Sequence, residues 1–150
     1  MEPITITTVA IAMSTIFSVK ASEKTGEKFG EFLSDLVSKS ALKLSKKSTL
    51  IKNLLQAEEA EPLQISGAIL EVKQIADRDP EIAKTISEIN TKAKQEPNSQ
   101  FQSKINQVRL EADKLDNQQP AIQNLTELAN KIGVVNQATT INQTINQNIF

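Results

Sequence analysis

The chain has 150 residues, a net charge of −1, and neither cysteine nor histidine. The missing cysteines exclude disulfides, zinc ribbons and thiol nucleophiles, and the missing histidines remove the commonest metal ligand and the usual proton shuttle. With five Phe and no Trp or Tyr, the core must be aliphatic, and the chain lacks the aromatic platforms on which single-stranded nucleic acids stack.

Residues 4–19 form an uncharged, largely apolar segment. It lacks the basic start and the cleavage site of a signal peptide, and it is shorter than the about 20 apolar residues of a constitutive membrane span. Two interpretations stay open: a buried central helix, or a segment that leaves the fold and inserts into lipid as an oligomer, where its threonines and serines bond to neighbours. The second predicts membrane insertion through Ile4, Ile6, Val9, Ile11, Met13, Ile16, Phe17 and Val19.

The next segment, Lys20 to Lys39, is amphipathic around Phe29, Phe32, Leu33, Leu36 and Val37. Gly26 and Gly30 weaken a helix here and indicate a bend or a close crossing. A further helix is expected from Leu50 to Ala57.

Between Leu36 and Ala57 every charged side chain is a lysine. A cluster of this kind suits contact with an anionic lipid surface, and it equally suits a solvated helix face with favourable positive charge at a helix C-terminus. The lysines are Lys39, Lys43, Lys46, Lys47 and Lys52.

Four later segments repeat apolar residues at helical spacing, so each predicts an amphipathic helix. Asp79 and Pro80 favour a helix start, and Gly133 favours a helix end. The stripes are Ile65, Ile69, Val72 and Ala76; Ile82, Ile86, Ile89 and Ala93; Phe101, Ile105, Val108, Ala112 and Leu115; and Ile122, Leu125, Ala129 and Ile132. We therefore expect an all-α fold, an irregular bundle of five to six helices over residues 1–132, followed by an uncharged, β-prone tail over residues 133–150.

The tail alternates apolar and polar residues with a period of two, as a β-strand does. Its β-branched residues, amides and absent charge meet the composition of cross-β stacks. A disordered tail and ordinary strand pairing in a dimer are the alternatives. The predicted amyloid motif comprises Val135, Asn136, Gln137, Ile141, Asn142, Gln143, Ile145, Asn146, Gln147 and Ile149.

Nothing in the sequence proposes a reaction. It contains no phosphate-binding loop, nucleophile elbow or EF-hand spacing, and its four glycines leave little room for a loop that cradles phosphate. We expect no catalytic, metal-binding or cofactor-binding residues, no enzymatic activity and no nucleic-acid partner.

An opening Met1-Glu2-Pro3-Ile4-Thr5-Ile6, a helical bundle of about 130 residues and an Asn/Gln-rich end together resemble the bacterial Bell-domain proteins. These are HeLo-like cell-death effectors with a C-terminal bacterial amyloid signalling motif. The tail departs from the better-known motif with interspersed glycines, because only Gly133 is present.

The resemblance implies a programmed-cell-death executioner of bacterial immunity. It implies a NOD-like receptor partner whose matching N-terminal motif templates assembly of the tail. It further implies a cytoplasmic resting protein that reaches the inner membrane on activation and permeabilises it through residues 4–19. A non-lytic adaptor or scaffold that oligomerises through its tail is the alternative, and a structural filament component is a third. Asp at Ile11 or Ile16 is expected to abolish toxicity in an executioner while sparing assembly.

Overall fold

The computed structural model describes residues 4–26, 28–57, 60–116 and 120–133. Within these ranges the chain forms seven α-helices, one 3-10 helix and no strand. The all-α class is therefore confirmed, whereas the expected five to six helices were too few. The elements are α1 (Ile6–Thr25), α2 (Glu31–Lys47), α3 (Thr49–Gln56), α4 (Pro62–Arg78), α5 (Pro80–Gln95), α6 (Ser99–Asp113), η1 (Ile122–Leu125) and α7 (Thr126–Ile132).

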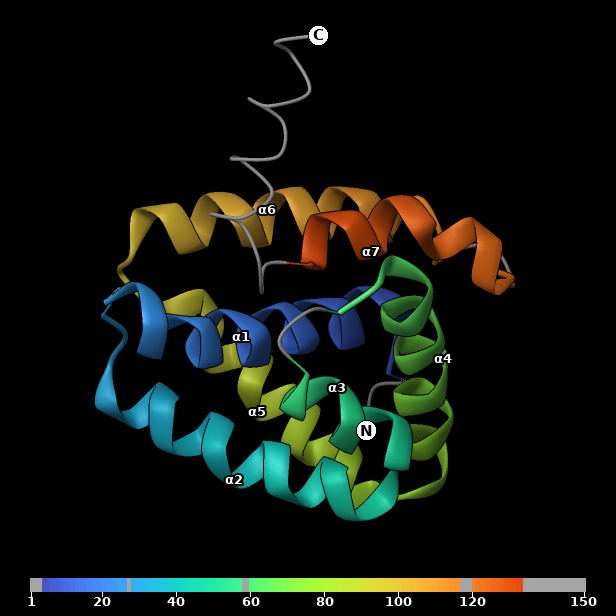
Figure 1. Ribbon diagram of the computed structural model, residues 1–150, viewed down its shortest axis with the longest axis horizontal. Coiled ribbons are helices and arrows are strands. Elements are labelled where there is room, and N and C mark those ends of the chain that lie inside the picture. The colour runs from blue at the N-terminus through green and yellow to red at the C-terminus, as the bar shows by residue number, and fades with distance from the viewer. Residues whose placement is uncertain (1–3, 27, 58–59, 117–119, 134–150) are drawn as a thin grey trace, which may run out of the picture.

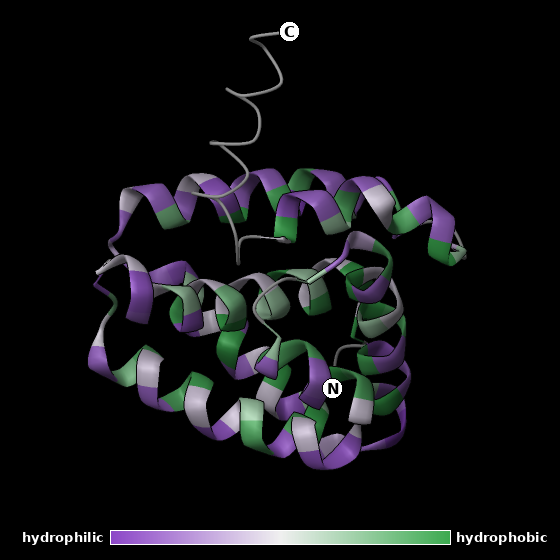
Figure 2. Ribbon diagram, in the orientation of Figure 1, coloured by the Kyte–Doolittle hydropathy of each residue, from purple (hydrophilic) through white to green (hydrophobic). Residues whose placement is uncertain are grey.

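Helix α1 is the central element of the bundle. It contacts α2, α4, α5, α6 and α7, and in Figure 1 it runs between α6 and α7 on one side and α2 on the other. Figure 2 shows that α1 carries few hydrophilic residues before its C-terminal end, whereas the outer helices alternate hydrophilic and hydrophobic residues. A helix that is apolar all round must be enclosed on all sides, and the amphipathic helices supply that enclosure.

The outer helices bury the predicted stripes. Ile65, Ile69, Val72 and Ala76 of α4 are buried, and so are Ile82, Ile86, Ile89 and Ala93 of α5 and Phe101, Ile105, Val108 and Ala112 of α6. Two predicted positions are wrong, because Phe32 is 65% exposed and Ile122 is 40% exposed. In α2 the buried phase is set by Leu33, Val37, Ser40 and Leu44, about 100° around the helix from Phe32.

The boundaries of α1 and α2 differ from the expected ones, whereas α3 corresponds to the helix expected from Leu50 to Ala57. The run from Lys20 to Lys39 is not one helix: α1 ends where Gly26 adopts a left-handed φ of 77°, a conformation that glycine reaches without steric cost. Helix α2 then continues to Lys47. It stops at Ser48, whose hydroxyl accepts a hydrogen bond from the Ile51 N–H (3.1 Å) and so caps α3.

The expected start at Asp79 and Pro80 is confirmed. The Asp79 carboxylate accepts hydrogen bonds from the N–H groups of Glu81 (3.0 Å) and Ile82 (3.4 Å), and Pro80 opens α5. Helix α7 ends at Gly133, as expected, although Gly133 is not left-handed there, with φ −64°.

Candidate functional site

The residues predicted for membrane insertion lie inside the bundle. Ile4 precedes α1 and the other seven, Ile6, Val9, Ile11, Met13, Ile16, Phe17 and Val19, belong to α1; all eight are at most 8% exposed. In the described conformation the first of the two interpretations therefore holds, since residues 4–19 form a buried central helix. Any contact of this segment with lipid requires that the bundle open.

Two hydrophobic clusters enclose α1. Ile11 packs with Phe101 and Ile105 of α6 and Ala93 of α5, while most of the other apolar residues of α1 join the main core. Among the described residues no helix combines the length and the hydropathy that a single membrane crossing needs.

A polar cluster ties the first turn of α1 to the end of α6. The Thr7 hydroxyl lies 2.7 Å from Asp113 Oδ1, and it also contacts Asp116 Oδ2. Asp116 Oδ1 accepts a hydrogen bond from the Thr7 backbone N–H (3.2 Å). Because a carboxylate is favourable at a helix N-terminus, Asp116 both satisfies α1 and holds it against α6.

Two further hydrogen bonds hold α1 to its neighbours. Asn90 of α5 donates from Nδ2 to the Thr8 carbonyl oxygen (2.8 Å), and Lys20 donates from Nζ to the carbonyl oxygen of Leu55 in α3 (2.6 Å). None of these polar contacts was predicted. Thr7, Asn90 and Asp113 are ordinary surface-type residues on helices far apart in sequence, so no local pattern marks them.

Two serine hydroxyls are buried without a partner in the described structure. They belong to Ser14 of α1 and Ser40 of α2. A buried hydroxyl that makes no hydrogen bond destabilises the fold by about 1–3 kcal/mol. The core around α1 therefore carries polar groups that the folded bundle does not use.

Ser14→Ala is expected to raise the free energy of unfolding by about 1 kcal/mol, because it removes an unpaired hydroxyl and places the best helix former in α1. Urea unfolding followed by circular dichroism measures the change. Ser66→Ala is the control, since Ser66 is equally buried but donates to the Pro62 carbonyl oxygen (3.0 Å). A Ser14→Ala variant that is less stable than the native chain would contradict the assignment.

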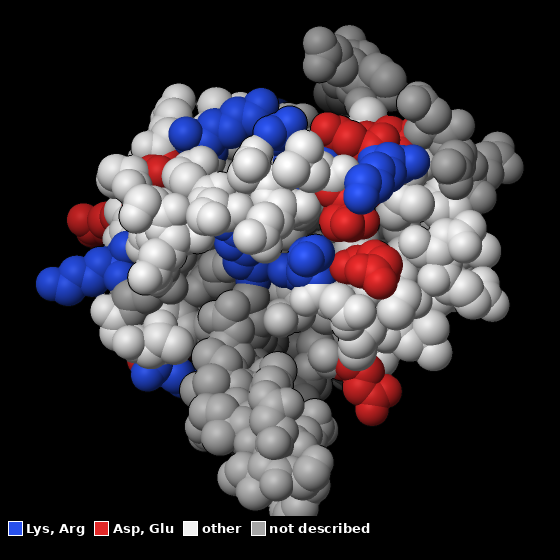
Figure 3. Space-filling view, turned by 90° about the horizontal axis from the view of Figure 1, so that it is seen from above, with Lys and Arg blue, Asp and Glu red and all other residues white. Residues whose placement is uncertain are grey.

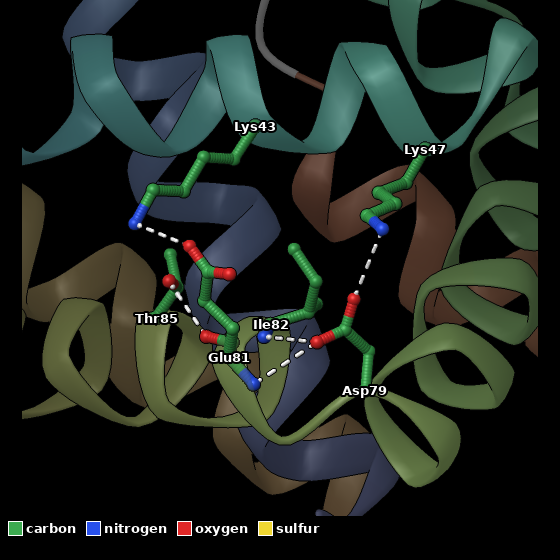
Figure 4. A network of polar contacts seen from close by, with 6 residues as sticks. All are labelled: Lys43, Lys47, Asp79, Glu81, Ile82 and Thr85. Atoms are coloured by element: carbon green, nitrogen blue, oxygen red, sulfur yellow. Dashed lines mark hydrogen bonds and ion pairs between the residues drawn. The ribbon is translucent and has the colours of Figure 1, made fainter.

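The five lysines of the cluster differ in whether they form ion pairs. Lys43 pairs with Glu81 and Lys47 with Asp79, each at 3.3 Å, so both reach from α2 to the start of α5 (Figure 4). These two lysines therefore hold α2 against α5. Lys39, Lys46 and Lys52 are exposed and form no ion pair with a described residue.

The ion pair between Lys47 and Asp79 lowers the pKa of the Asp79 carboxyl below its ordinary value of 3.8. The hydrogen bond from Lys47 is the largest cause, and the N–H groups of Ile82 and Glu81 act in the same direction, whereas burial opposes them. A carboxyl with a lowered pKa stabilises the fold above its unfolded pKa, and this stabilisation is lost as the pH falls through the folded pKa.

Asp79→Asn is expected to keep the α5 cap, because Asn caps helices as well as Asp does, while it loses the pair with Lys47. The variant is then less stable than the native chain at neutral pH. The difference begins to shrink below pH 3.8 and vanishes once the pH has fallen through the lowered pKa of Asp79 in the folded native chain. Urea unfolding of both proteins across this pH range tests it. A stability difference that persists in acid would show that the negative charge of Asp79 is not the cause of the difference.

A cavity of about 460 Å³ lies beside the start of α1, lined by Ile4, Thr5, Ile6, Leu70, Lys73, Gln74, Asp77, Asp116 and Pro120. Its ionisable groups are already engaged, because Lys73 pairs with Asp77 (3.0 Å) and Asp116 binds Thr7. Within the described ranges no cluster of three or more acidic side chains could hold a metal ion.

The predicted amyloid residues, Val135 to Ile149, lie outside the described residues, and so does the expected β-prone character of residues 134–150. The described chain ends at Gly133, directly after α7, and α7 packs on α4, α6 and α1.

Comparisons with protein-family models, with curated proteins and with solved structures found no match to this chain.

Proposed function

We propose that this protein is a membrane-directed cell-death effector whose membrane-active segment is α1. The observation that carries the proposal is the enclosure of an uncharged stretch, Ile4 to Val19, at the centre of a bundle of amphipathic helices. In this arrangement the most apolar part of the chain is hidden until the bundle opens.

The composition of α1 favours insertion as a group rather than as a single span. Its uncharged part, Ile6 to Val19, extends only about 21 Å, which is less than the about 30 Å thickness of the hydrocarbon core of a bilayer. Threonines and serines are interspersed along it, and in lipid such residues hydrogen-bond to neighbouring helices. Ser14, which has no partner in the bundle, gains one in an assembly of this kind.

The proposed trigger is the C-terminal segment 133–150. Its alternating Ile, Asn and Gln side chains suit in-register stacking, in which each added copy pairs its whole backbone. A receptor with a matching motif, of the NOD-like class that the Bell-domain resemblance implies, nucleates the stack. Clustering of the copies then brings many α1 segments to one place on the inner membrane.

The proposal is tested with the full chain and dye-loaded vesicles made of equal parts phosphatidylglycerol and phosphatidylcholine. Fibrils of a fusion that carries only residues 133–150 are added as seeds. Seedable, thioflavin-positive fibrils with a spacing near 4.7–4.8 Å and seed-dependent dye release are expected. A tail that stays soluble would overturn the proposed trigger, and seeded assembly without dye release would overturn the membrane activity.

A non-lytic adaptor is the second candidate, and two observations favour it. The apolar residues of the segment 4–19 are core residues in the described conformation, and no described helix combines the length and the hydropathy of a membrane span. An adaptor assembles through its tail with the bundle intact. The two candidates differ in whether α1 must leave the bundle.

A further inference from the structure

The outward face of α2 carries a small basic surface in its second half. Lys39, Leu42 and Lys46 follow one another at spacings of three and four residues, so they share one face of the helix. Leu42, a large apolar side chain between the two lysines, is 60% exposed. We call these three residues, together with the exposed Lys52 of α3, a helix that packs against α2, the basic surface.

Within the described part of the chain, no acidic residue forms an ion pair with the lysines of the basic surface. No acidic residue occurs from Leu36 to Ala57, and the nearest acidic groups of α2, Glu31 and Asp35, lie before Lys39. From α5, Glu81 and Asp79 face α2, but Lys43 and Lys47 pair with them. Among the described residues, Glu81 and Asp79 are thus engaged by Lys43 and Lys47 rather than by Lys39, Lys46 or Lys52.

The opposite side of the bundle carries charges of both signs. Over α6 and α7, Figure 3 shows lysines and arginines mixed with aspartates and glutamates. At the C-terminal end of α6, Arg109 pairs with Asp113, and Lys114, which directly follows the helix, pairs with Glu111. In contrast, the basic surface has one sign of charge around an exposed apolar residue. Phe32 is the other large exposed apolar residue of α2, and it lies between Glu31 and Asp35 in the sequence. Lys92 Nζ lies 4.5 Å from the centroid of its ring.

We propose that the basic surface is a docking site for an anionic lipid bilayer. Leu42 enters the headgroup region while Lys39, Lys46 and Lys52 contact lipid phosphates. The proposal adds the lipid class and the contacting residues to the proposed function, on which its biological purpose rests. Of the five lysines suggested by the sequence, the structure selects these three and assigns Lys43 and Lys47 to the bundle.

The basic surface is suited to clustered copies rather than to single molecules. One lysine near an anionic membrane surface raises the binding constant about fivefold. Three lysines and one leucine thus give a weak monomeric contact, whereas copies joined through their tails bind together, and the combined affinity rises steeply. Membrane docking then follows assembly without any change in the bundle.

The experiment measures co-sedimentation of the full chain with vesicles, before and after seeding with tail fibrils. Lys39→Gln/Lys46→Gln is expected to lower monomer binding to vesicles with equal parts phosphatidylglycerol and phosphatidylcholine about 25-fold, from the about fivefold contribution of each lysine. Leu42→Ser is expected to lower it as well. The binding weakens as salt is added and is absent with pure phosphatidylcholine.

Lys114→Gln/Lys131→Gln is the matched control. It removes the same net charge from two exposed lysines of the α6–α7 side, of which Lys114 pairs with Glu111. An effect of net charge alone would therefore weaken both double variants equally. Equal losses, or vesicle binding that survives Lys39→Gln/Lys46→Gln, would overturn the assignment. Loss of binding to poly-glutamate but not to vesicles would identify an acidic protein as the partner instead.

Dye release separates this proposal from the proposed function. Vesicle binding that depends on the basic surface, without dye release on seeding, would leave the docking site standing and overturn the lytic function. Dye release that is unchanged in Lys39→Gln/Lys46→Gln would overturn the docking site alone.

Discussion

A protein in which α1 is chemically tethered to α6 is expected to assemble on tail seeds but to release no dye from vesicles. The tether joins cysteines in the variant Thr7→Cys/Asp113→Cys through a cleavable bis-maleimide. The native chain has no cysteine, so the link forms at these two positions only. Cleavage of the link is expected to restore dye release to the level of the unlinked variant.

The positions follow from the structure. The Thr7 hydroxyl and Asp113 Oδ1 are 2.7 Å apart, and they join the first turn of α1 to the last turn of α6, so a short spacer links them without opening the bundle. Helix α1 can enter a bilayer only if this end moves away from α6. The tether therefore blocks insertion and leaves residues 133–150 free to stack.

A link within one helix controls for the modification itself. Lys73 and Asp77 pair at 3.0 Å along α4, in the lining of the cavity beside the start of α1. Lys73→Cys/Asp77→Cys with the same cross-linker therefore modifies the neighbourhood of α1 without joining α1 to another helix, and it is expected to release dye normally. Full dye release from the tethered Thr7→Cys/Asp113→Cys protein would show that α1 need not leave the bundle. The lytic role of α1 would then be wrong.

Much of the fold could be predicted because it depends on local patterns. The stripes of α4, α5 and α6 have a helical period, and the Asp79-Pro80 pair encodes a helix start that the structure confirms. The separate helix expected from Leu50 to Ala57 is confirmed as α3, whereas the continuation of α2 to Lys47 was missed, and the capping hydroxyl of Ser48 marks the break between the two helices. Phe32 was placed inside because a run of apolar residues leaves the phase of the buried face ambiguous.

The candidate site depends on long-range pairing, which the sequence does not encode locally. Residues 4–19 could be recognised as unusual, but their neighbours could not. The contacts of Thr7 with Asp113 and Asp116 span more than 100 residues. The lysine cluster illustrates the same limit. Lys43 and Lys47 pair with acidic residues at the start of α5, whereas Lys39 and Lys46 do not, and no local pattern in the sequence distinguishes the two sets.

Ile16→Asp is expected to abolish cooperative folding. Ile16 is 2% exposed and belongs to the main core, so the substitution removes a buried apolar side chain and places an unpaired charge there. Together these effects cost more than about 5 kcal/mol, which is comparable to the about 5–15 kcal/mol of a typical domain. Thermal unfolding followed by circular dichroism is expected to show no transition.

Leu110→Asp supplies the comparison, because Leu110 is an exposed residue of α6 and the same change there is expected to stay within about 0.5 kcal/mol of the native chain. A cooperative transition for Ile16→Asp near that of the native chain would show that α1 is not part of the core. If the bundle does unfold, Asp at Ile11 or Ile16 abolishes toxicity and adaptor binding alike. The aspartate variants then do not separate the two functions, whereas the tether does, because it keeps the core of the bundle and changes only the freedom of α1 to leave it.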